Sequence, residues 1–83
     1  MVVYYTYVLE SLNLPGTRYI GQTSDPWRRL EQHNAGENRS TVRRRPWKIV
    51  LYIAFETRNQ AVRFERYLKS GSGHAFANRH FWI

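Results

Sequence analysis

The amino-terminal part of the chain reads VVYYTYVLESLNLPGTRYIGQ from residue 2 to residue 22. Over residues 2–9, β-branched and aromatic side chains alternate between two faces, which predicts a strand. The turn-forming sequence Asn13-Leu14-Pro15-Gly16 follows, and residues 17–22 have the composition of a second strand. We therefore predict an antiparallel hairpin with a longer connecting loop, which would begin a sheet.

A helix and a third strand are predicted after the hairpin. Asp25 is a good helix N-cap, and Pro26 suits the first helical position because its missing N–H would have no helical partner. Residues 34–36 should end this helix. A basic loop over residues 37–46 then leads to residues 47–55, which are rich in β-branched and aromatic side chains and should form a strand.

The second helix has a defined start. Thr57 and Gln60 fit the capping-box pattern, in which a hydroxyl residue is followed three positions later by Gln or Glu. Helical spacing places Ala61, Phe64 and Leu68 on the buried side of this helix.

For the end of the chain, the sequence predicts a less regular structure. Gly71 should end the second helix, residues 70–73 should be flexible, and residues 74–79 should form one last short helix. The order of the elements predicts an α+β fold with a small, mainly antiparallel sheet.

Charge is the first clue to function. The chain has 83 residues, enough for one compact domain. Thirteen Lys and Arg face six Asp and Glu, and eleven of the thirteen are arginine, whose planar guanidinium matches phosphate oxygens. A small basic domain with 16% aromatic residues is typical of nucleic-acid binders. The alternative is a basic surface that docks on an acidic partner.

Several classes are excluded or disfavoured by composition. The absence of cysteine excludes disulfides and thiolate metal sites. The start of the chain has no signal-peptide pattern, and the apolar runs are too short to span a bilayer. We therefore expect a cytoplasmic protein that has no membrane partner.

Glu65 is the most informative single residue. Helical geometry places it about 40° from Ala61, at the border of the apolar face of the second helix. A carboxylate there is costly to desolvate unless it has a cation or a metal as its partner. Two explanations stay open, a functional ligand or a structural ion pair with Arg66 or Lys69.

Four other residues are candidates for chemistry. Arg29 and His33 lie four positions apart on the first helix, so they project from one face. Arg29 could clamp a phosphate, and His33 could relay a proton near neutral pH. Tyr7 and Tyr19 lie on the two hairpin strands, where core packing is the usual role of tyrosine. A tyrosine serves as a general base only when its phenol is activated.

The basic loop and the tryptophans suggest a nucleic-acid surface. Arg43, Arg44 and Arg45, with Lys48 nearby, form a candidate phosphate-contact patch, although a solvated loop or a localisation cluster would have the same composition. The three tryptophans could stack on bases, but most tryptophans in so small a domain belong to the core.

Together these residues resemble the GIY-YIG nuclease family, in particular its small, single-domain bacterial members. The family's first motif aligns with Tyr5-Thr6-Tyr7 and its second with Tyr19-Ile20-Gly21. Arg29 and His33 follow at family spacing, and Glu65 falls where the family has its metal-binding glutamate. The first motif has Tyr-Thr in place of Gly-Ile, so Tyr7 is the residue of this motif that we expect to take part in the chemistry.

The resemblance implies a fold and a set of roles. The fold is a three-stranded antiparallel sheet flanked by helices, with residues 1–83 forming a single nuclease domain. Glu65 would hold one divalent ion, Mg²⁺ or Mn²⁺, and Tyr7, Tyr19, Arg29 and His33 would surround the scissile phosphate. Asn78 would take the place of a late family asparagine. The residues assigned to nucleic-acid binding are Arg43, Arg44, Arg45, Lys48, Lys69 and Asn78.

The predicted function is a metal-dependent endonuclease that hydrolyses phosphodiester bonds in DNA. Basic residues with exposed aromatics favour single-stranded or branched DNA, whose bases can stack on them. A catalytically silent nucleic-acid-binding module of the same fold is the first alternative, and a basic structural or interaction protein is the second. The choice between DNA and RNA and the number of chains in the assembly stay open.

Overall fold

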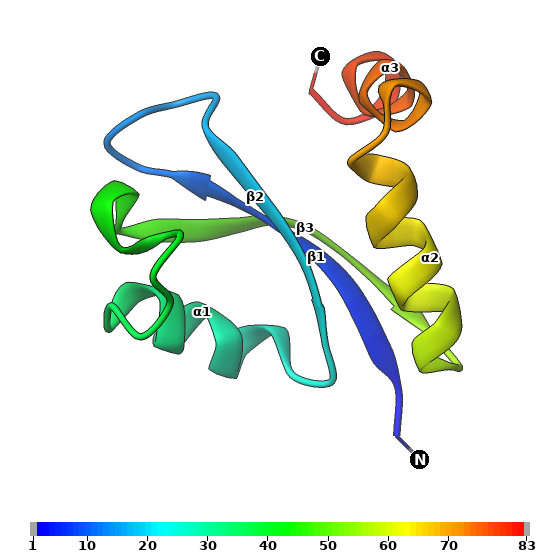
Figure 1. Cartoon of the computed structure of the whole chain (residues 1–83), viewed down its shortest axis with the longest axis horizontal. Helices are drawn as coiled ribbons and strands as arrows, with labels where there is room; N and C mark the ends of the chain where they lie inside the picture. Colours follow the sequence, from blue (N-terminus) through cyan, green and yellow to red (C-terminus); the bar gives the residue numbers. More distant parts are fainter. Residues whose placement is uncertain (1, 83) are drawn as a thin grey trace.

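The computed structural model describes residues 2–82, which form a three-stranded antiparallel sheet with helices on both faces (Figure 1). The strand order is β2-β1-β3, so β1 is central. The elements are β1 (Tyr4–Ser11), β2 (Arg18–Thr23), α1 (Pro26–Asn34), a 3-10 turn (Val42–Arg44), β3 (Trp47–Phe55), α2 (Arg58–Leu68) and α3 (Gly71–His80).

The central strand is covered on both faces. Tyr7 and Leu9 face the α1 side, where they pack with Trp47. Val8 faces the other side and packs with Leu68 and Ala77 from α2 and α3. In Figure 1, α1 lies on one side of the sheet and α2 on the other. The structure therefore has three layers, and β1 contributes side chains to two small cores.

The predicted first strand is displaced along the chain. It was expected at residues 2–9, but β1 starts at Tyr4 and continues to Ser11. Glu10 and Ser11 pair with Lys48 and Trp47 of β3 after an irregularity in register between Val8 and Leu9. The ladder thus continues through polar residues that the apolar alternation could not identify.

Helix α1 forms as its cap residues predict. The Asp25 side chain accepts a hydrogen bond from the backbone N–H of Arg28 at 3.1 Å, and Pro26 occupies the first turn. Gly36, with φ +83°, follows the end of the helix in the left-handed conformation that glycine tolerates best.

Helix α2 has the predicted capping box at Thr57 and Gln60. Its Ala61 and Leu68 are buried, and Phe64 is partly buried against the same core. The hydroxyl of Thr6 donates to the backbone carbonyl of Ala61 at 2.7 Å, which attaches α2 to the central strand.

The predicted end of the chain is wrong in one respect. Residues 70–73 are the start of a ten-residue helix, α3, instead of a flexible link. Ser70 caps this helix by accepting from the N–H of Gly73 at 3.1 Å. A Cβ at Gly73 would overlap the carbonyl oxygen of Tyr67, so glycine is needed for close packing between α2 and α3. No helix within residues 2–82 has the length and apolarity needed to cross a membrane.

Candidate active site

A buried chain of three side chains forms the centre of the site. The Tyr7 hydroxyl lies 3.0 Å from His33 Nε2, and His33 Nδ1 lies 2.8 Å from Thr41 Oγ1. The three residues are 1%, 0% and 1% exposed. Tyr7 comes from β1, His33 from α1, and Thr41 from the loop that precedes β3. Both ring nitrogens of His33 are therefore satisfied, which fixes the orientation of the imidazole.

The hydrogen-bond pattern fits the tautomer of His33 that carries its proton on Nδ1. In this tautomer the Thr41 hydroxyl accepts from the N–H at Nδ1 and can itself donate to the carbonyl of Asn38, 3.4 Å away. The Nε2 atom then carries a lone pair and accepts the phenolic proton of Tyr7.

Tyr19 joins this centre from the neighbouring strand. Its ring centroid is 4.8 Å from that of His33 and 6.3 Å from that of Tyr7. Gly21 pairs with Tyr7 across β1 and β2, and a Cβ there would lie 2.7 Å from the Tyr7 hydroxyl. The glycine of the second motif is therefore needed because the Tyr7 ring lies against the backbone of β2.

Arg29 brings a positive charge to the same place. Burial raises the pKa of Tyr7 above 10.0, while the nearby guanidinium of Arg29 lowers it. The Arg29 guanidinium itself donates to Gln32 Oε1 at 2.7 Å. Burial lowers the pKa of His33 below 6.5, and the charge of Arg29 lowers it further. At neutral pH, Tyr7 is therefore protonated and His33 is uncharged.

Glu65 approaches the centre from α2. Its negative charge contributes to the raised pKa of Tyr7, which places it within electrostatic reach of the phenol. The Glu65 side chain is 20% exposed, and its carboxylate accepts from Lys69 Nζ at 2.6 Å. The structure thus contains the ion pair that the sequence offered as one explanation of this residue.

The carboxylate of Glu65 suits one kind of metal site. Among residues 2–82, no group of three or more His, Cys, Asp or Glu side chains could enclose a metal ion. A single, partly exposed carboxylate is nevertheless a normal protein ligand for Mg²⁺, which retains several waters and binds substrate phosphate. The donor set therefore fits a hydrated Mg²⁺ or Mn²⁺ ion and does not fit an all-protein cage.

Tyr7, Tyr19 and His33 thus lie together, and the charges of Arg29 and Glu65 act on the Tyr7 phenol. Similarity to known proteins supports the family and the fold, while the roles of these five residues stay predictions. Residues 3–78 match the family model of the GIY-YIG catalytic domain. The chain belongs to the GIY-YIG family. The resemblance inferred from the motifs is confirmed at this level, as is the three-stranded antiparallel GIY-YIG fold.

Two curated proteins with similar sequences are much longer than this chain. The structure-specific endonuclease subunit SLX1 homolog of Giardia intestinalis is 45% identical over 65 residues, which cover 74% of this chain and 18% of that protein. The SLX1 subunit of Candida dubliniensis is 38% identical over 84 residues, which cover 93% of this chain and 28% of that protein. This chain therefore spans less than a third of the length of these curated relatives.

A solved GIY-YIG-like structure matches nearly the whole chain. The solution NMR structure of a UPF0213 protein from Bacillus halodurans is 29% identical, with a TM-score of 0.54. The match covers 95% of this chain and 86% of that one.

The basic loop, residues 37–46, lies next to the centre formed by Tyr7, Tyr19 and His33. Arg43, Arg44, Arg45 and Lys48 are exposed, whereas Thr41, within the same loop, contacts His33. Two backbone carbonyls anchor the loop, since Ser11 Oγ donates to that of Arg44 at 2.6 Å and Asn13 Nδ2 to that of Arg45 at 3.1 Å. The sequence therefore predicted an exposed basic surface correctly, and its contact with nucleic acid stays a prediction.

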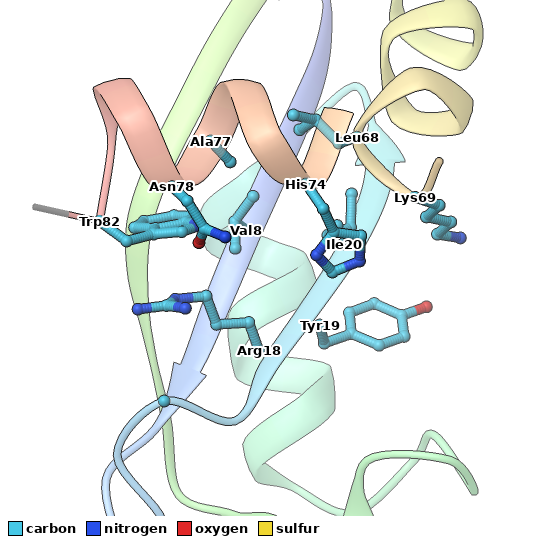
Figure 2. Close-up of a pocket in the computed structure, with 11 residues that line it drawn as sticks. Val8, Arg18, Tyr19, Ile20, Leu68, Lys69, His74, Ala77, Asn78 and Trp82 are labelled. Carbon is cyan, nitrogen blue, oxygen red and sulfur yellow. The ribbon is translucent and has the colours of Figure 1, made fainter. Parts of the chain in front are cut away.

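The other two residues assigned to nucleic acid lie elsewhere. Lys69 and Asn78 line a cavity of about 460 Å³ between β2 and α3, which Tyr19 also lines (Figure 2). The tryptophans have three different environments: Trp47 is buried, Trp27 is 56% exposed, and Trp82 is partly buried at the cavity.

Sequence reasoning missed two residues that contact Tyr7 or His33. Thr41 lies in an irregular loop, and no sequence pattern marks it as the partner of His33. Gly21 did have a signal, because it belongs to the motif Tyr19-Ile20-Gly21. Its steric role became visible only when its position opposite Tyr7 was known.

Proposed function

We propose that this GIY-YIG domain is a divalent-metal-dependent endonuclease that hydrolyses phosphodiester bonds in DNA. The observation that supports the proposal best is the convergence on the Tyr7 hydroxyl. His33 hydrogen-bonds to it, and Arg29, Tyr19 and Glu65 all influence its pKa. Four groups suited to acid–base chemistry, phosphate binding and metal binding around one phenolic oxygen are characteristic of a catalytic centre.

Tyr7 and His33 would move the proton of the attacking water. The water would give a proton to the Tyr7 oxygen while the phenolic proton passes to His33 Nε2, 3.0 Å away. This transfer leaves a neutral tyrosine and an imidazolium, whose second nitrogen is bonded to Thr41. The lowered pKa of His33 ensures that its lone pair is available at neutral pH.

Arg29 and Tyr19 would act on the phosphate. The Arg29 guanidinium would stabilise the negative charge that develops on the non-bridging oxygens. The Tyr19 hydroxyl would hydrogen-bond to the phosphate or to the attacking water.

Glu65 would hold a hydrated Mg²⁺ or Mn²⁺ ion, which when bound polarises the phosphate and stabilises the leaving oxygen. For this role the carboxylate must exchange its ion pair with Lys69 for the metal ion. Lys69 would then be free to contact a DNA phosphate.

We also propose that branched or single-stranded DNA is the preferred substrate. The relatives from Giardia and Candida are named structure-specific endonuclease subunits, which supports a junction substrate. The net charge of +7 supports an extended phosphate-binding surface. Cytoplasmic location and the organisation of residues 1–83 as a single domain stay predictions.

The first experiment compares wild type with Glu65→Gln on labelled branched, single-stranded and duplex DNA, in Mg²⁺, Mn²⁺ or EDTA. We expect wild type to cut branched DNA fastest, only with metal. Glu65→Gln should lose at least about 100-fold in rate because it removes the metal-binding charge. Glu56→Gln is the control, since Glu56 is exposed at the turn before α2. Cutting in EDTA, or an unchanged rate in Glu65→Gln, would contradict the proposal.

The ion pair between Glu65 and Lys69 favours one alternative, a nucleic-acid-binding module without activity. In such a module the carboxylate would need no metal partner, because Lys69 already neutralises it. Tight DNA binding without metal-dependent cutting of any substrate would select this alternative.

A further inference from the structure

A cavity of about 460 Å³ lies between β2 and α3, beside the catalytic centre (Figure 2). Its inner wall is apolar and consists of Val8, Ile20, Leu68 and Ala77. Its remaining lining is mostly polar or aromatic and consists of Gly16, Arg18, Tyr19, Lys69, His74, Asn78 and Trp82. An apolar wall with a few convergent polar groups is typical of small-molecule sites, and the volume lies within their usual range.

The cavity and the catalytic centre share residues. Tyr19 lines the cavity, and its ring also lies 4.8 Å from the ring of His33. Lys69 lines the cavity and is ion-paired with Glu65. A ligand in the cavity would therefore lie next to the position proposed for the scissile phosphate.

Charge in the cavity favours an anionic ligand. Arg18 and Lys69 are cationic, and their partners Glu10 and Glu65 do not line the cavity, which has no acidic residue in its lining. Figure 2 shows the imidazole of His74 projecting from α3 toward Ile20 and Tyr19. His74 is exposed, and neither the proposed mechanism nor the sequence motifs assign it a role.

A flat surface is held in place at the other end of the cavity. The Arg18 guanidinium carbon lies 4.0 Å from the centroid of the Trp82 ring, and Arg18 Nε pairs with Glu10 at 3.3 Å. The Trp82 ring also packs beside Phe81, with 5.8 Å between their centroids. The indole and the guanidinium that lies over it, beside an aliphatic wall, form a flat surface suitable for the face of a nucleobase.

We propose that this cavity binds one unpaired nucleotide of the substrate, adjacent to the scissile phosphate. The base would lie against Trp82 and Ile20, and its phosphate would contact His74 and Lys69. A base can enter only when it is unstacked, which is easiest in single-stranded or branched nucleic acid. The proposal rests on the proposed nuclease function and gives a physical reason for its preference among substrates.

Abasic substrates test the position of the base. Branched DNA with a stable abasic residue on either side of the cut is compared with the normal strand. One abasic position should slow wild type about tenfold, the effect of losing one base contact. The Trp82→Leu variant should cut the abasic and the normal substrate at similar rates, because leucine keeps the apolar packing but lacks the flat ring. Trp27→Leu should retain the tenfold ratio, since Trp27 is exposed outside the cavity.

A matched pair of histidines tests the phosphate contact. His74→Ala should weaken binding of branched DNA severalfold, whereas His80→Ala should not. His80 is exposed on the same helix and does not line the cavity. Equal effects of the two variants would contradict the assigned role of His74.

A titration followed by NMR tests the cavity independently of catalysis. The wild-type domain is titrated with the 5′-phosphorylated thymidine dinucleotide in the absence of metal. Shifts of the Ala77 amide and the Trp82 indole would support the proposal even if the domain cut no substrate. If wild type cut abasic and normal DNA equally, the cavity proposal would be wrong and the nuclease function would stand. Shifts confined to residues 43–48 would also overturn the cavity proposal.

Discussion

At the Tyr7 hydroxyl, burial and charge act on the phenol in opposite directions. Burial raises its pKa, and the nearby positive charge of Arg29 lowers it. Because burial is the larger effect, the phenol remains protonated at neutral pH. Tyr7 can then accept a proton from water only if it gives its own to His33 Nε2. In the proposed mechanism, Tyr7 therefore acts as a pair with His33 and not as a tyrosinate.

Replacing Tyr7 by phenylalanine should remove this relay. We expect single-turnover cleavage by Tyr7→Phe to fall by about 100-fold or more, the usual contribution of a general base, with DNA affinity little changed. The variant also leaves His33 Nε2 without a partner, so its thermal stability is measured alongside. Tyr5→Phe is the matched control, because Tyr5 lies on the same strand and its ring packs on Tyr52. Cleavage by Tyr7→Phe at the wild-type rate would remove Tyr7 from the base role.

At the scale of the elements, replacing glycine by alanine should affect the free energy of unfolding differently at two nearby positions of α3. A Cβ at Gly73 would overlap the Tyr67 carbonyl oxygen, whereas a Cβ at Gly71 would meet nothing within 4 Å. We expect Gly73→Ala to lower the free energy of unfolding by about 1–3 kcal/mol, as overpacking does. Gly71→Ala should leave it unchanged or raise it by about 0.4–1 kcal/mol. Urea denaturation of the two variants measures both effects, and equal stabilities would contradict the packing described for α3.

Helix α3 also shows a limit of predicting helix starts from local sequence. Asp25 with Pro26, and Thr57 with Gln60, predicted their helix starts because the cap and the first turn are adjacent in sequence. Ser70 is an equally good cap, but the glycines after it favoured a flexible link. Their use depends on the approach of α3 to α2, which is a tertiary property that no local pattern specifies.

At the scale of the whole molecule, the sequence predicted the fold and the proximity of Tyr7, Tyr19 and His33, but not the surroundings of these residues. Fixed spacing along one strand pair and one helix was enough to bring Tyr7, Tyr19 and His33 together. Thr41 was missed because its contact with His33 depends on the path of an irregular loop. The cavity was missed because its walls come from β2 and α3, which are separated by most of the chain.

Charge is also distributed unevenly over the molecule, and its effect on DNA binding depends on position. The basic loop contains Thr41, which contacts His33 of the proposed catalytic centre, whereas Arg58 and Arg63 lie on α2, across the sheet (Figure 1). If Arg43 and Arg44 contact phosphates, replacing both by Gln should reduce the slope of log affinity against log salt. The expected reduction is about 0.7–0.9 for each lost contact.

The double variant Arg58→Gln, Arg63→Gln separates local contact from total charge. It also lowers the net charge by two, so a general electrostatic attraction would weaken equally in both double variants. We expect only the loop variant to change the salt slope, as measured by fluorescence anisotropy with labelled branched DNA from 50 to 200 mM salt. Equal slopes for the two variants would show that the loop makes no specific phosphate contact, and that DNA is held by the charge of the molecule as a whole.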